Sequence, residues 1–235
     1  IHRGGIEEVR GLAEEAQRSR RPYPDYLADL AGLEVAGRRE RRIERRMGDA
    51  RFPVLKTLDA FDFGSQPGVD RDHVLELARG EFVAAHRNVV LVGAVGTGKT
   101  HLAIALGIAC CQREHRVRFT TAAELTNALV EAKAAGRLSR KLEQFARFDV
   151  VILDELGYVP FTAVGGELLF EVLSQRYERG STLLTSNLPF DEWTSVFGSE
   201  RLTGALLDRL THHVHILEMN GDSFRLASSR KRQKE

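Results

Sequence analysis

Residues 93–100 of this chain read GAVGTGKT and match the pattern GxxxxGK(S/T). The apolar run NVVLV at 88–92 precedes them and a helical run follows, which is the strand–loop–helix context that this pattern needs. Glycines at 93, 96 and 98 let the loop turn its backbone N–H groups inward, and the N-terminus of the following helix adds partial positive charge. The segment therefore predicts a phosphate-binding loop at the end of a buried strand.

The natural ligand of such a loop is a nucleoside triphosphate. Lys99 is expected to reach the β- and γ-phosphates as a positive charge, and the Thr100 hydroxyl is expected to hold Mg²⁺. The residues predicted to bind the nucleotide are Gly93, Ala94, Val95, Gly96, Thr97, Gly98, Lys99 and Thr100. A glycine-rich turn without function is the alternative, and the combination of strand, spacing, lysine and threonine argues against it.

Four further apolar runs follow this unit: VRFTT at 117–121, DVVILD at 149–154, STLLTS at 181–186 and HVHILEM at 213–219. Helical stretches such as THLAIALGIACCQ and GELLFEVLSQRYERG lie between runs. Alternation of short buried strands with helices predicts an α/β fold in which helices flank an open parallel sheet.

Polar residues end two of these predicted strands. Asp154 and Glu155 close the run that begins at 149, where Asp154 is expected to help hold Mg²⁺ and Glu155 to activate the attacking water. Asn187 follows the run STLLTS, and its amide is expected to hydrogen-bond the γ-phosphate and that water. The alternatives are solvated acids at a strand end and an asparagine chosen for a turn.

Composition excludes several other classes of protein. With 235 residues, 43% of them hydrophobic, the chain can bury a globular core. Its two cysteines, Cys110 and Cys111, are adjacent, so neither a loop-closing disulfide nor a four-ligand zinc site is expected. We expect ordinary core or surface histidines at His212, His213 and His215, whose spacing is not typical of a metal site. No apolar run approaches the roughly 20 residues of a membrane span and no leader pattern is evident, so we expect a cytoplasmic protein without a membrane partner.

The N-terminal part differs from the rest in composition. Residues 6–50 have helical character interrupted at Pro22 and Pro24, which predicts a small helical domain over 1–51. A linker that packs on the core is predicted over 52–70, and the nucleotide-binding core with a basic tail over 71–235. Seven arginines against three acids at 38–51 form one basic segment, and the tail at 230–232 belongs to another.

The basic segment at 38–51 is amphipathic if it is helical. At 100° per residue, Leu33, Ala36, Ile43 and Met47 share one stripe. The opposite side carries the residues predicted to bind DNA: Arg38, Arg39, Arg41, Arg42, Arg45 and Arg46. Phosphate contacts by such a face give strong salt dependence and little sequence preference. The alternative is a solvated face that is partly neutralised by nearby glutamates.

The motifs GAVGTGKT, DVVILDELGYVP, FTTAAEL and LTSNLPFDEW together resemble those of the IstB-like ATP-binding proteins. These are transposase helpers of bacterial insertion sequences, within the AAA+ P-loop ATPases and close to the DnaC and DnaI helicase loaders. The resemblance runs from the basic helical segment through LKTLDAFDF to DSFRL, which is nearly the whole chain. It implies an AAA+ core over 71–235 without a full C-terminal helical lid.

By this resemblance, the loop at 93–100 is the Walker A motif, Asp154 and Glu155 are the Walker B acids, and Asn187 is the first sensor residue. Arg209 is the implied arginine finger, with Arg201 left open as the other candidate, and Arg225 is a candidate late sensor. The family implies ATP with Mg²⁺, assembly as a homo-oligomer on duplex DNA, and a transposase of the same insertion sequence as partner.

Two other functions stay open at this point. A replicative helicase loader would use the same nucleotide site with a helicase as partner, and LDELGYVP and LTSNLPFDEW favour the transposase helper. A DNA-binding scaffold without significant ATP turnover is the second, and the presence of Lys99, Asp154 and Glu155 argues against it. A small-molecule kinase is a more distant third, because no acceptor-binding pocket is evident from the sequence.

Overall fold

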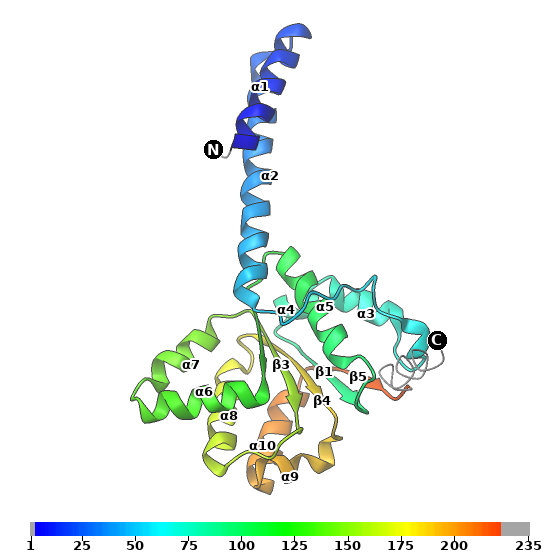
Figure 1. Ribbon diagram of the computed structural model, residues 1–235, viewed down its shortest axis with the longest axis vertical. Helices are drawn as coiled ribbons and strands as arrows, with labels where there is room; N and C mark the ends of the chain where they lie inside the picture. Colours follow the sequence, from blue (N-terminus) through cyan, green and yellow to red (C-terminus); the bar gives the residue numbers. More distant parts are fainter. Residues whose placement is uncertain (1–2, 222–235) are drawn as a thin grey trace, which may run out of the picture. The chain divides into compact units, whose positions relative to one another are not determined.

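The computed structural model describes residues 3–221, which divide into two compact units at the junction of Arg45 and Arg46 (Figure 1). The first unit contains α1 (Arg3–Arg18) and most of α2 (Tyr23–Ala50). Pro22 precedes α2 and Pro24 lies in its first turn, where proline is tolerated because the N–H groups there have no partner within the helix. The helical domain predicted over 1–51 and the linker predicted over 52–70 both remain predictions. Arg225 and the basic segment 230–232 lie outside the described residues.

The second unit is built on a five-stranded parallel sheet, which confirms the predicted α/β fold. The strands are β1 (Asn88–Gly93), β2 (Val117–Thr121), β3 (Val150–Leu156), β4 (Ser181–Ser186) and β5 (Val214–Met219). Their order is β2-β3-β4-β1-β5, and every pair is parallel. Because all the strands point the same way, the loops after β1, β3 and β4 meet at one edge of the sheet.

Helices cover both faces of this sheet (Figure 1). They are α3 (Arg71–Ala78), α4 (Glu81–Ala84), α5 (Lys99–Gln112), α6 (Ala122–Ala134), α7 (Leu138–Ala146), α8 (Ala163–Arg176), α9 (Trp193–Phe197) and α10 (Glu200–Thr211). Two one-turn 3₁₀ helices, η1 (Phe63–Ser65) and η2 (Phe190–Glu192), complete the unit.

The two faces of the sheet bury two separate apolar clusters. In β1, Val89 and Leu91 belong to the cluster that contains α3 and α5, whereas Val90 belongs to the cluster under α6, α8 and α10. This alternation follows from the two-residue period of a strand, and both faces are apolar because helices cover both. Helix α5 is buried nearly all round, and burial raises the pKa of its Cys110 and Cys111 thiols to about 12. Both thiols are therefore protonated and unreactive at neutral pH.

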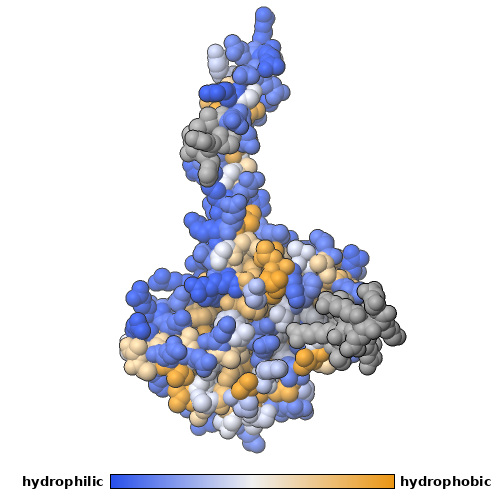
Figure 2. Space-filling model, viewed as in Figure 1, coloured by the Kyte–Doolittle hydropathy of each residue, from blue (hydrophilic) through white to orange (hydrophobic). Residues whose placement is uncertain are grey.

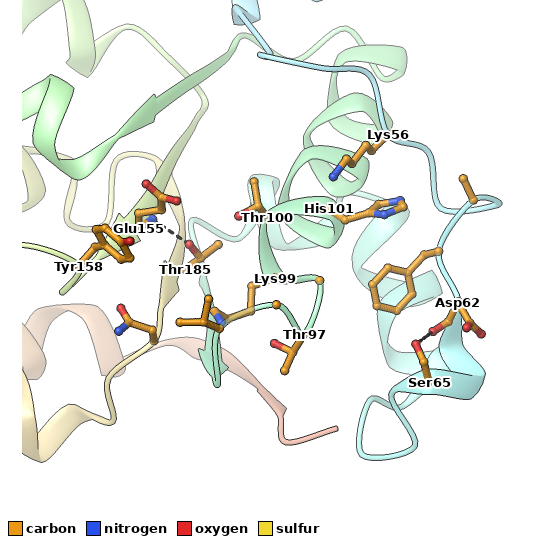
Figure 3. A pocket seen from close by; sticks show the side chains of 16 residues that line it. Lys56, Asp62, Ser65, Thr97, Lys99, Thr100, His101, Glu155, Tyr158 and Thr185 are labelled. Carbon is orange, nitrogen blue, oxygen red and sulfur yellow. Dashed lines mark hydrogen bonds between the residues drawn. The ribbon is translucent and has the colours of Figure 1, made fainter. Parts of the chain in front are cut away.

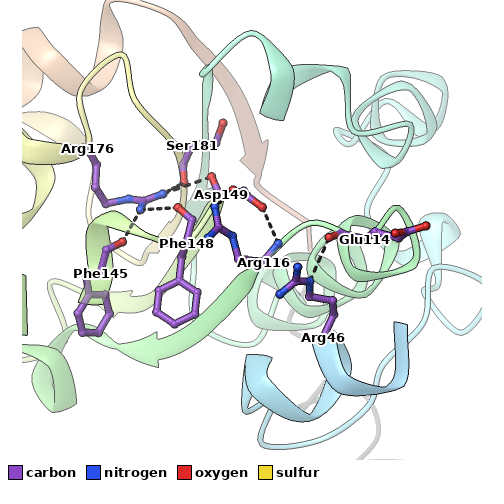
Figure 4. A network of polar contacts seen from close by, with 8 residues as sticks. All are labelled: Arg46, Glu114, Arg116, Phe145, Phe148, Asp149, Arg176 and Ser181. Atoms are coloured by element: carbon purple, nitrogen blue, oxygen red, sulfur yellow. Dashed lines mark hydrogen bonds and ion pairs between the residues drawn. The ribbon is translucent and has the colours of Figure 1, made fainter. Parts of the chain in front are cut away.

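Arg176, at the end of α8, ties the amino ends of β3 and β4 to α7 (Figure 4). It is 2% exposed, and its guanidinium donates to the carbonyl oxygens of Phe145 at 2.8 Å, Phe148 at 2.9 Å and Ser181 at 2.6 Å. Burial lowers its pKa to about 10, so it stays charged at neutral pH. The charge is satisfied by carbonyl dipoles, and the contacts hold the sheet end that lies away from the nucleotide loop.

Hydropathy varies over the surface (Figure 2). Polar side chains cover most of the visible face of α2, and on the visible face of the second unit polar side chains alternate with small apolar areas. Among residues 3–221, no helix has the length and apolar character of a membrane span.

Candidate functional site: a phosphate loop facing two strand ends

The predicted phosphate loop connects β1 to α5 and requires glycine at two positions. At Gly93, φ is 152°, and a Cβ would lie 2.1 Å from the carbonyl oxygen of Met219 on neighbouring β5. Gly98 precedes α5 with φ of 94°, and a Cβ there would lie 3.0 Å from the Phe61 ring. Lys99 is buried and donates to the carbonyl oxygens of Gly93 at 2.7 Å and Ala94 at 2.6 Å. The ammonium group therefore lies inside the curve of the loop, where a bound phosphate would need it.

Asp154 connects this loop to the strand ends. Its side chain is 3% exposed, and its Oδ1 accepts hydrogen bonds from the Thr100 hydroxyl at 3.0 Å and the Thr185 hydroxyl at 2.5 Å. Thr100 lies in the first turn of α5, Asp154 on β3 and Thr185 on β4. Three elements that are distant in the sequence thus meet at one carboxylate oxygen.

Glu155 adopts a backbone conformation that a non-glycine residue rarely takes. Its φ is 61°, and it lies where the pairing of β3 with β4 shifts register between Leu153 and Leu156. A bulge of this kind turns a side chain out of the regular alternation, and such bulges occur often beside active sites. The Thr185 hydroxyl accepts the Glu155 N–H at 3.0 Å and so supports the bulge. The exposed Glu155 carboxyl group consequently lies beside the loop rather than inside the sheet.

A hollow of about 410 Å³ lies in front of these groups (Figure 3). One side is formed by Glu155, Tyr158, Thr185 and Asn187, and the loop residues 95–100 form its floor. The opposite side comes from the segment before α3, with Lys56, Ala60, Phe61, Asp62 and Ser65. His101 also lines the hollow. The size is suitable for a small organic ligand such as a nucleotide.

Two aromatic rings stiffen the wall opposite Glu155. The Phe61 and His101 rings meet edge to face, with centroids 5.3 Å apart. His101 Nε2 also lies 2.9 Å from the Thr57 carbonyl oxygen, and Phe61 is buried in the apolar cluster under α5. The segment before α3 therefore packs on the core and supplies a wall of the hollow.

The predicted arginine residues lie elsewhere. Arg209, on α10, donates to the Ser174 hydroxyl on α8, and its guanidinium lies 4.7 Å over the Phe170 ring. Arg201 is exposed and lines a separate depression near Phe197. Neither residue lines the hollow at the phosphate loop.

The arginines predicted to bind DNA also lie outside the hollow. Arg38, Arg39, Arg41, Arg42 and Arg45 are exposed on the first unit, where Arg38 pairs with Glu34 at 2.6 Å. Arg46 is half-buried in the second unit and donates to the Glu114 carbonyl oxygen at 3.1 Å. Arg46 thus has a structural contact that the helical-wheel argument did not anticipate.

Sequence reasoning missed several residues of the hollow. Thr185 carried no signal, because a threonine in a strand is ordinary. Phe61 lies in the segment 52–70 that was predicted only as a linker packing on the core, and Lys56, His101 and Tyr158 belong to no nucleotide-binding pattern.

The oxygen ligands around Asp154 fit Mg²⁺. This ion prefers hard oxygen ligands and usually keeps waters and substrate phosphates in its coordination shell. The Thr100 hydroxyl and the Asp154 carboxylate provide two such oxygens next to the phosphate loop. Both residues fit the predicted role in holding a phosphate-bound Mg²⁺.

The parallel sheet and the loop after β1 define an α/β P-loop protein of the AAA+ class. A family model described as IstB-like ATP binding protein matches residues 4–232, and the chain belongs to that family. An ATP-binding protein of insertion sequence IS21 from Pseudomonas aeruginosa is 44% identical over 223 residues, which are 95% of this chain and 84% of that protein. An ATP-binding protein of insertion sequence IS5376 from Geobacillus stearothermophilus is 37% identical over 219 residues, which are 93% of this chain and 87% of that protein.

Solved structures support the fold assignment. DnaA from Aquifex aeolicus, solved with AMPPCP bound, superposes with a TM-score of 0.61 at 22% identity, over 78% of this chain and 55% of that one. The DnaC helicase loader superposes with a TM-score of 0.53 at 19% identity, over 75% of this chain and 99% of that one. At these identities the likeness establishes the shared AAA+ architecture.

Proposed function

We propose that this protein is an ATPase that assembles on duplex DNA and assists the transposase of its insertion sequence. The observation that carries the proposal is the convergence of the phosphate loop, the Asp154–Glu155 bulge and Asn187 on one hollow. A scaffold that only binds nucleotide has no need of an exposed carboxylate held beside the phosphate loop. The names of the relatives add the setting, because they are ATP-binding proteins of insertion sequences.

Each residue has a distinct part in the proposed hydrolysis. Lys99 neutralises the β- and γ-phosphates, while Thr100 and Asp154 would hold Mg²⁺, which when bound would supply positive charge for the phosphate oxygens. Glu155 accepts a hydrogen bond from the attacking water and then its proton. The Asn187 amide orients that water against the γ-phosphate.

The location of Arg209 supports an oligomer. An arginine near the γ-phosphate stabilises the charge of the transition state, yet neither Arg209 nor Arg201 lines the hollow of its own chain. A neighbouring subunit can supply the missing charge, so that the assembled form is the active one. We assign this role to Arg209, a half-buried residue in the last turn of α10.

The exposed arginines of the first unit are the proposed DNA contacts. Arg38, Arg39, Arg41, Arg42 and Arg45 carry positive charge on a single helix. Contacts of this kind bind phosphates and depend strongly on salt, with little sequence preference. Nucleotide binding in the second unit would then drive formation of the oligomer. The oligomer would carry many copies of these weak contacts, and together they would raise its affinity for DNA.

The two halves of the proposal are tested by separate variants of the full chain. Lys99→Ala should abolish ATP binding, whereas Glu155→Gln should bind ATP, hydrolyse it at least about a hundredfold more slowly and stay assembled on DNA. Glu143→Gln, an exposed acid on α7, is the matched control. Normal turnover by Glu155→Gln would refute the role of Glu155.

DNA binding is tested with Arg38, Arg42 and Arg45 replaced together. Substitution by alanine should weaken duplex binding and lower the slope of log K against log salt by about one for each lost phosphate contact. Substitution of the same residues by lysine keeps the charge and should preserve most of the affinity. An unchanged slope in the alanine variant places the DNA contacts on other residues.

The partner is tested with the purified transposase of the same insertion sequence. ATP-loaded protein on target DNA should stimulate strand transfer, and Lys99→Ala should not. If strand transfer is unaffected while a replicative helicase is loaded onto DNA, the helicase-loader alternative replaces the transposase assignment.

A further inference from the structure

Two histidines and one glutamate gather on the surface away from the nucleotide hollow. Glu178 follows α8, and His212 and His213 follow one another at the end of α10. One ligand atom from each residue lies within 4.8 Å of the other two, and all three side chains are exposed. Among residues 3–221, this is the one group of at least three histidine, cysteine or acidic side chains close enough to share a metal ion.

The local contacts prepare His212 for coordination. The Tyr177 hydroxyl lies 2.9 Å from His212 Nδ1, so with a proton on Nδ1 this contact leaves the lone pair of Nε2 available. The His212 and His213 rings lie with their centroids 4.2 Å apart. One imidazole nitrogen of each histidine and a Glu178 carboxylate oxygen are already close enough together to serve one ion after small side-chain rotations.

Distances decide whether an ion fits this group. Ligand atoms around a tetrahedral zinc ion lie about 3.3 Å from one another, as follows from a zinc–nitrogen distance of about 2.0 Å. Ligand atoms that lie within 4.8 Å need only small rotations about side-chain bonds to reach this spacing. All three side chains are exposed, and the neighbours of His212 in these contacts are Tyr177 and His213.

We propose that Glu178, His212 and His213 form a binding site for a divalent transition-metal ion such as Zn²⁺. Two imidazoles and one carboxylate suit zinc and its neighbours, whereas Mg²⁺ prefers an all-oxygen shell. The fourth coordination position faces solvent and takes a water. This site is separate from the Mg²⁺ site at Thr100 and Asp154, and its occupation does not depend on nucleotide.

Binding would join the ends of two helices. Glu178 belongs to the turn after α8, whereas His212 and His213 belong to the turn after α10. Arg209 already links these helices through Ser174, and it shares a surface depression with Tyr177 and Glu178. A metal ion bound here therefore stabilises the contact of α10 with α8 beside the proposed arginine finger.

The sequence alone did not indicate this site. His212 and His213 are adjacent, which is not a typical ligand spacing, and Glu178 comes from the other side of β4 in the sequence. His212 and His213 were therefore expected to be ordinary histidines without a metal-binding role. His215 lies apart from this group, and its Nδ1 is 3.1 Å from His73 Nε2.

The test uses the full chain without a polyhistidine tag and without nucleotide, in buffer with excess Mg²⁺. Zn²⁺ is titrated against a chromophoric chelator, and the midpoint temperature of unfolding is followed with and without Zn²⁺. We expect one tightly bound Zn²⁺ for each chain and a higher midpoint temperature when Zn²⁺ is present. With Co²⁺ as a probe, visible absorption bands should report coordination by nitrogen and oxygen.

Variants assign the ion to this site. His212→Ala, His213→Ala and Glu178→Gln should each weaken Zn²⁺ binding at least tenfold, and Tyr177→Phe should weaken it about tenfold through the orientation of His212. His86→Asn, at an exposed residue with φ of 52° that asparagine tolerates, should bind Zn²⁺ normally.

The outcomes separate this inference from the proposed function. Loss of stoichiometric Zn²⁺ in the three ligand variants, with unchanged midpoint temperatures in the absence of metal, supports the site. Absence of stoichiometric binding in the parent chain, or unchanged binding in the double variant of His212 and His213, overturns it. Neither result depends on ATP hydrolysis or on DNA.

Discussion

Replacement of Thr185 by valine removes one hydroxyl that serves two partners. This hydroxyl donates to the Asp154 carboxylate at 2.5 Å and accepts the Glu155 N–H at 3.0 Å. Thr185 is 2% exposed and Asp154 is 3% exposed, so both residues are largely shielded from water although Thr185 lines the hollow. Valine has nearly the same shape as threonine, so the substitution leaves no cavity and isolates the effect of the hydroxyl.

The magnitude follows from these two bonds. A hydrogen bond to a buried charged group contributes about 1.5–3 kcal/mol, and leaving the Glu155 N–H without a partner adds about 1 kcal/mol. Asp154 keeps the bond from Thr100, which limits the loss. We therefore expect Thr185→Val to lower the free energy of unfolding by about 2–4 kcal/mol.

Activity should change in a specific way. Glu155 has a positive φ, which for a residue other than glycine is unfavourable by about 1–3 kcal/mol and persists only where contacts support it. Without the Thr185 acceptor the bulge relaxes and the Glu155 carboxylate moves from its position. The kcat for ATP hydrolysis should fall at least tenfold, whereas the affinity for ATP should change little, because the loop at 93–100 is intact.

The assay compares three proteins: the parent chain, Thr185→Val and Thr185→Ser. Urea unfolding measures stability, steady-state hydrolysis gives kcat and KM, and a fluorescent nucleotide analogue gives the affinity. Thr185→Ser keeps the hydroxyl and should retain most of the kcat. Equal kcat and stability in the valine variant and the parent chain would show that Thr185 supports neither acid.

Three other substitutions or conditions give predictions of the same kind. Gly93→Ala places a Cβ 2.1 Å from the Met219 carbonyl oxygen, so nucleotide affinity should fall at least tenfold in a fluorescence titration and stability should fall by about 2 kcal/mol or more. Arg176→Met leaves several buried carbonyl oxygens without a donor and should lower the free energy of unfolding by about 3 kcal/mol in urea. Burial first, and then the charges of His73 and of a nearby arginine, lower the pKa of His215 below 6.5. His215 therefore binds a proton more readily in the unfolded chain than in the folded one. The stability that comes from the neutral His215 is fully present above about pH 6.5, and it is lost as the pH falls through the folded-state pKa of His215.

Matched variants control these three predictions. Gly204→Ala adds a methyl group inside α10 with no neighbouring atom within 4 Å, and it should leave stability equal or slightly higher. Arg179→Met removes an exposed arginine three residues after Arg176 and should have little effect on stability. His215→Gln should give a shallower pH dependence of the unfolding midpoint than the parent chain. If the parent chain and His215→Gln respond identically to pH, His215 is not the source of the dependence.

Local patterns predicted the parts of the fold that depend on neighbouring residues. The strand β1, the loop at 93–100 and α5 were predictable because each is fixed by a short run of residue types and by glycine positions. The inner strands β3 and β4 were predictable because a strand covered on both faces is buried along nearly its whole length, whereas the edge strand β5 is partly exposed. The strand ends at Asp154 and Asn187 followed from the parallel sheet, since all carboxyl ends meet at one edge.

Contacts between distant segments were not predictable in the same way. Thr185 lies in an ordinary strand, and only the register of β3 with β4 places its hydroxyl between Asp154 and Glu155. The wall formed by Phe61 depends on how the segment before α3 packs on α5. No sequence pattern identified Arg176, because its partners are backbone carbonyl groups near the end of α7 and at the start of β4.

In the proposed function, ATP controls assembly of this protein on DNA. Its most direct test is a titration of duplex DNA at one fixed salt concentration with ATP and Mg²⁺, with ADP, and without nucleotide, while particle size is measured in the same samples. Large DNA-bound oligomers should form with ATP and Mg²⁺ and in neither of the other two conditions. DNA binding and particle size that are the same in all three conditions would contradict it.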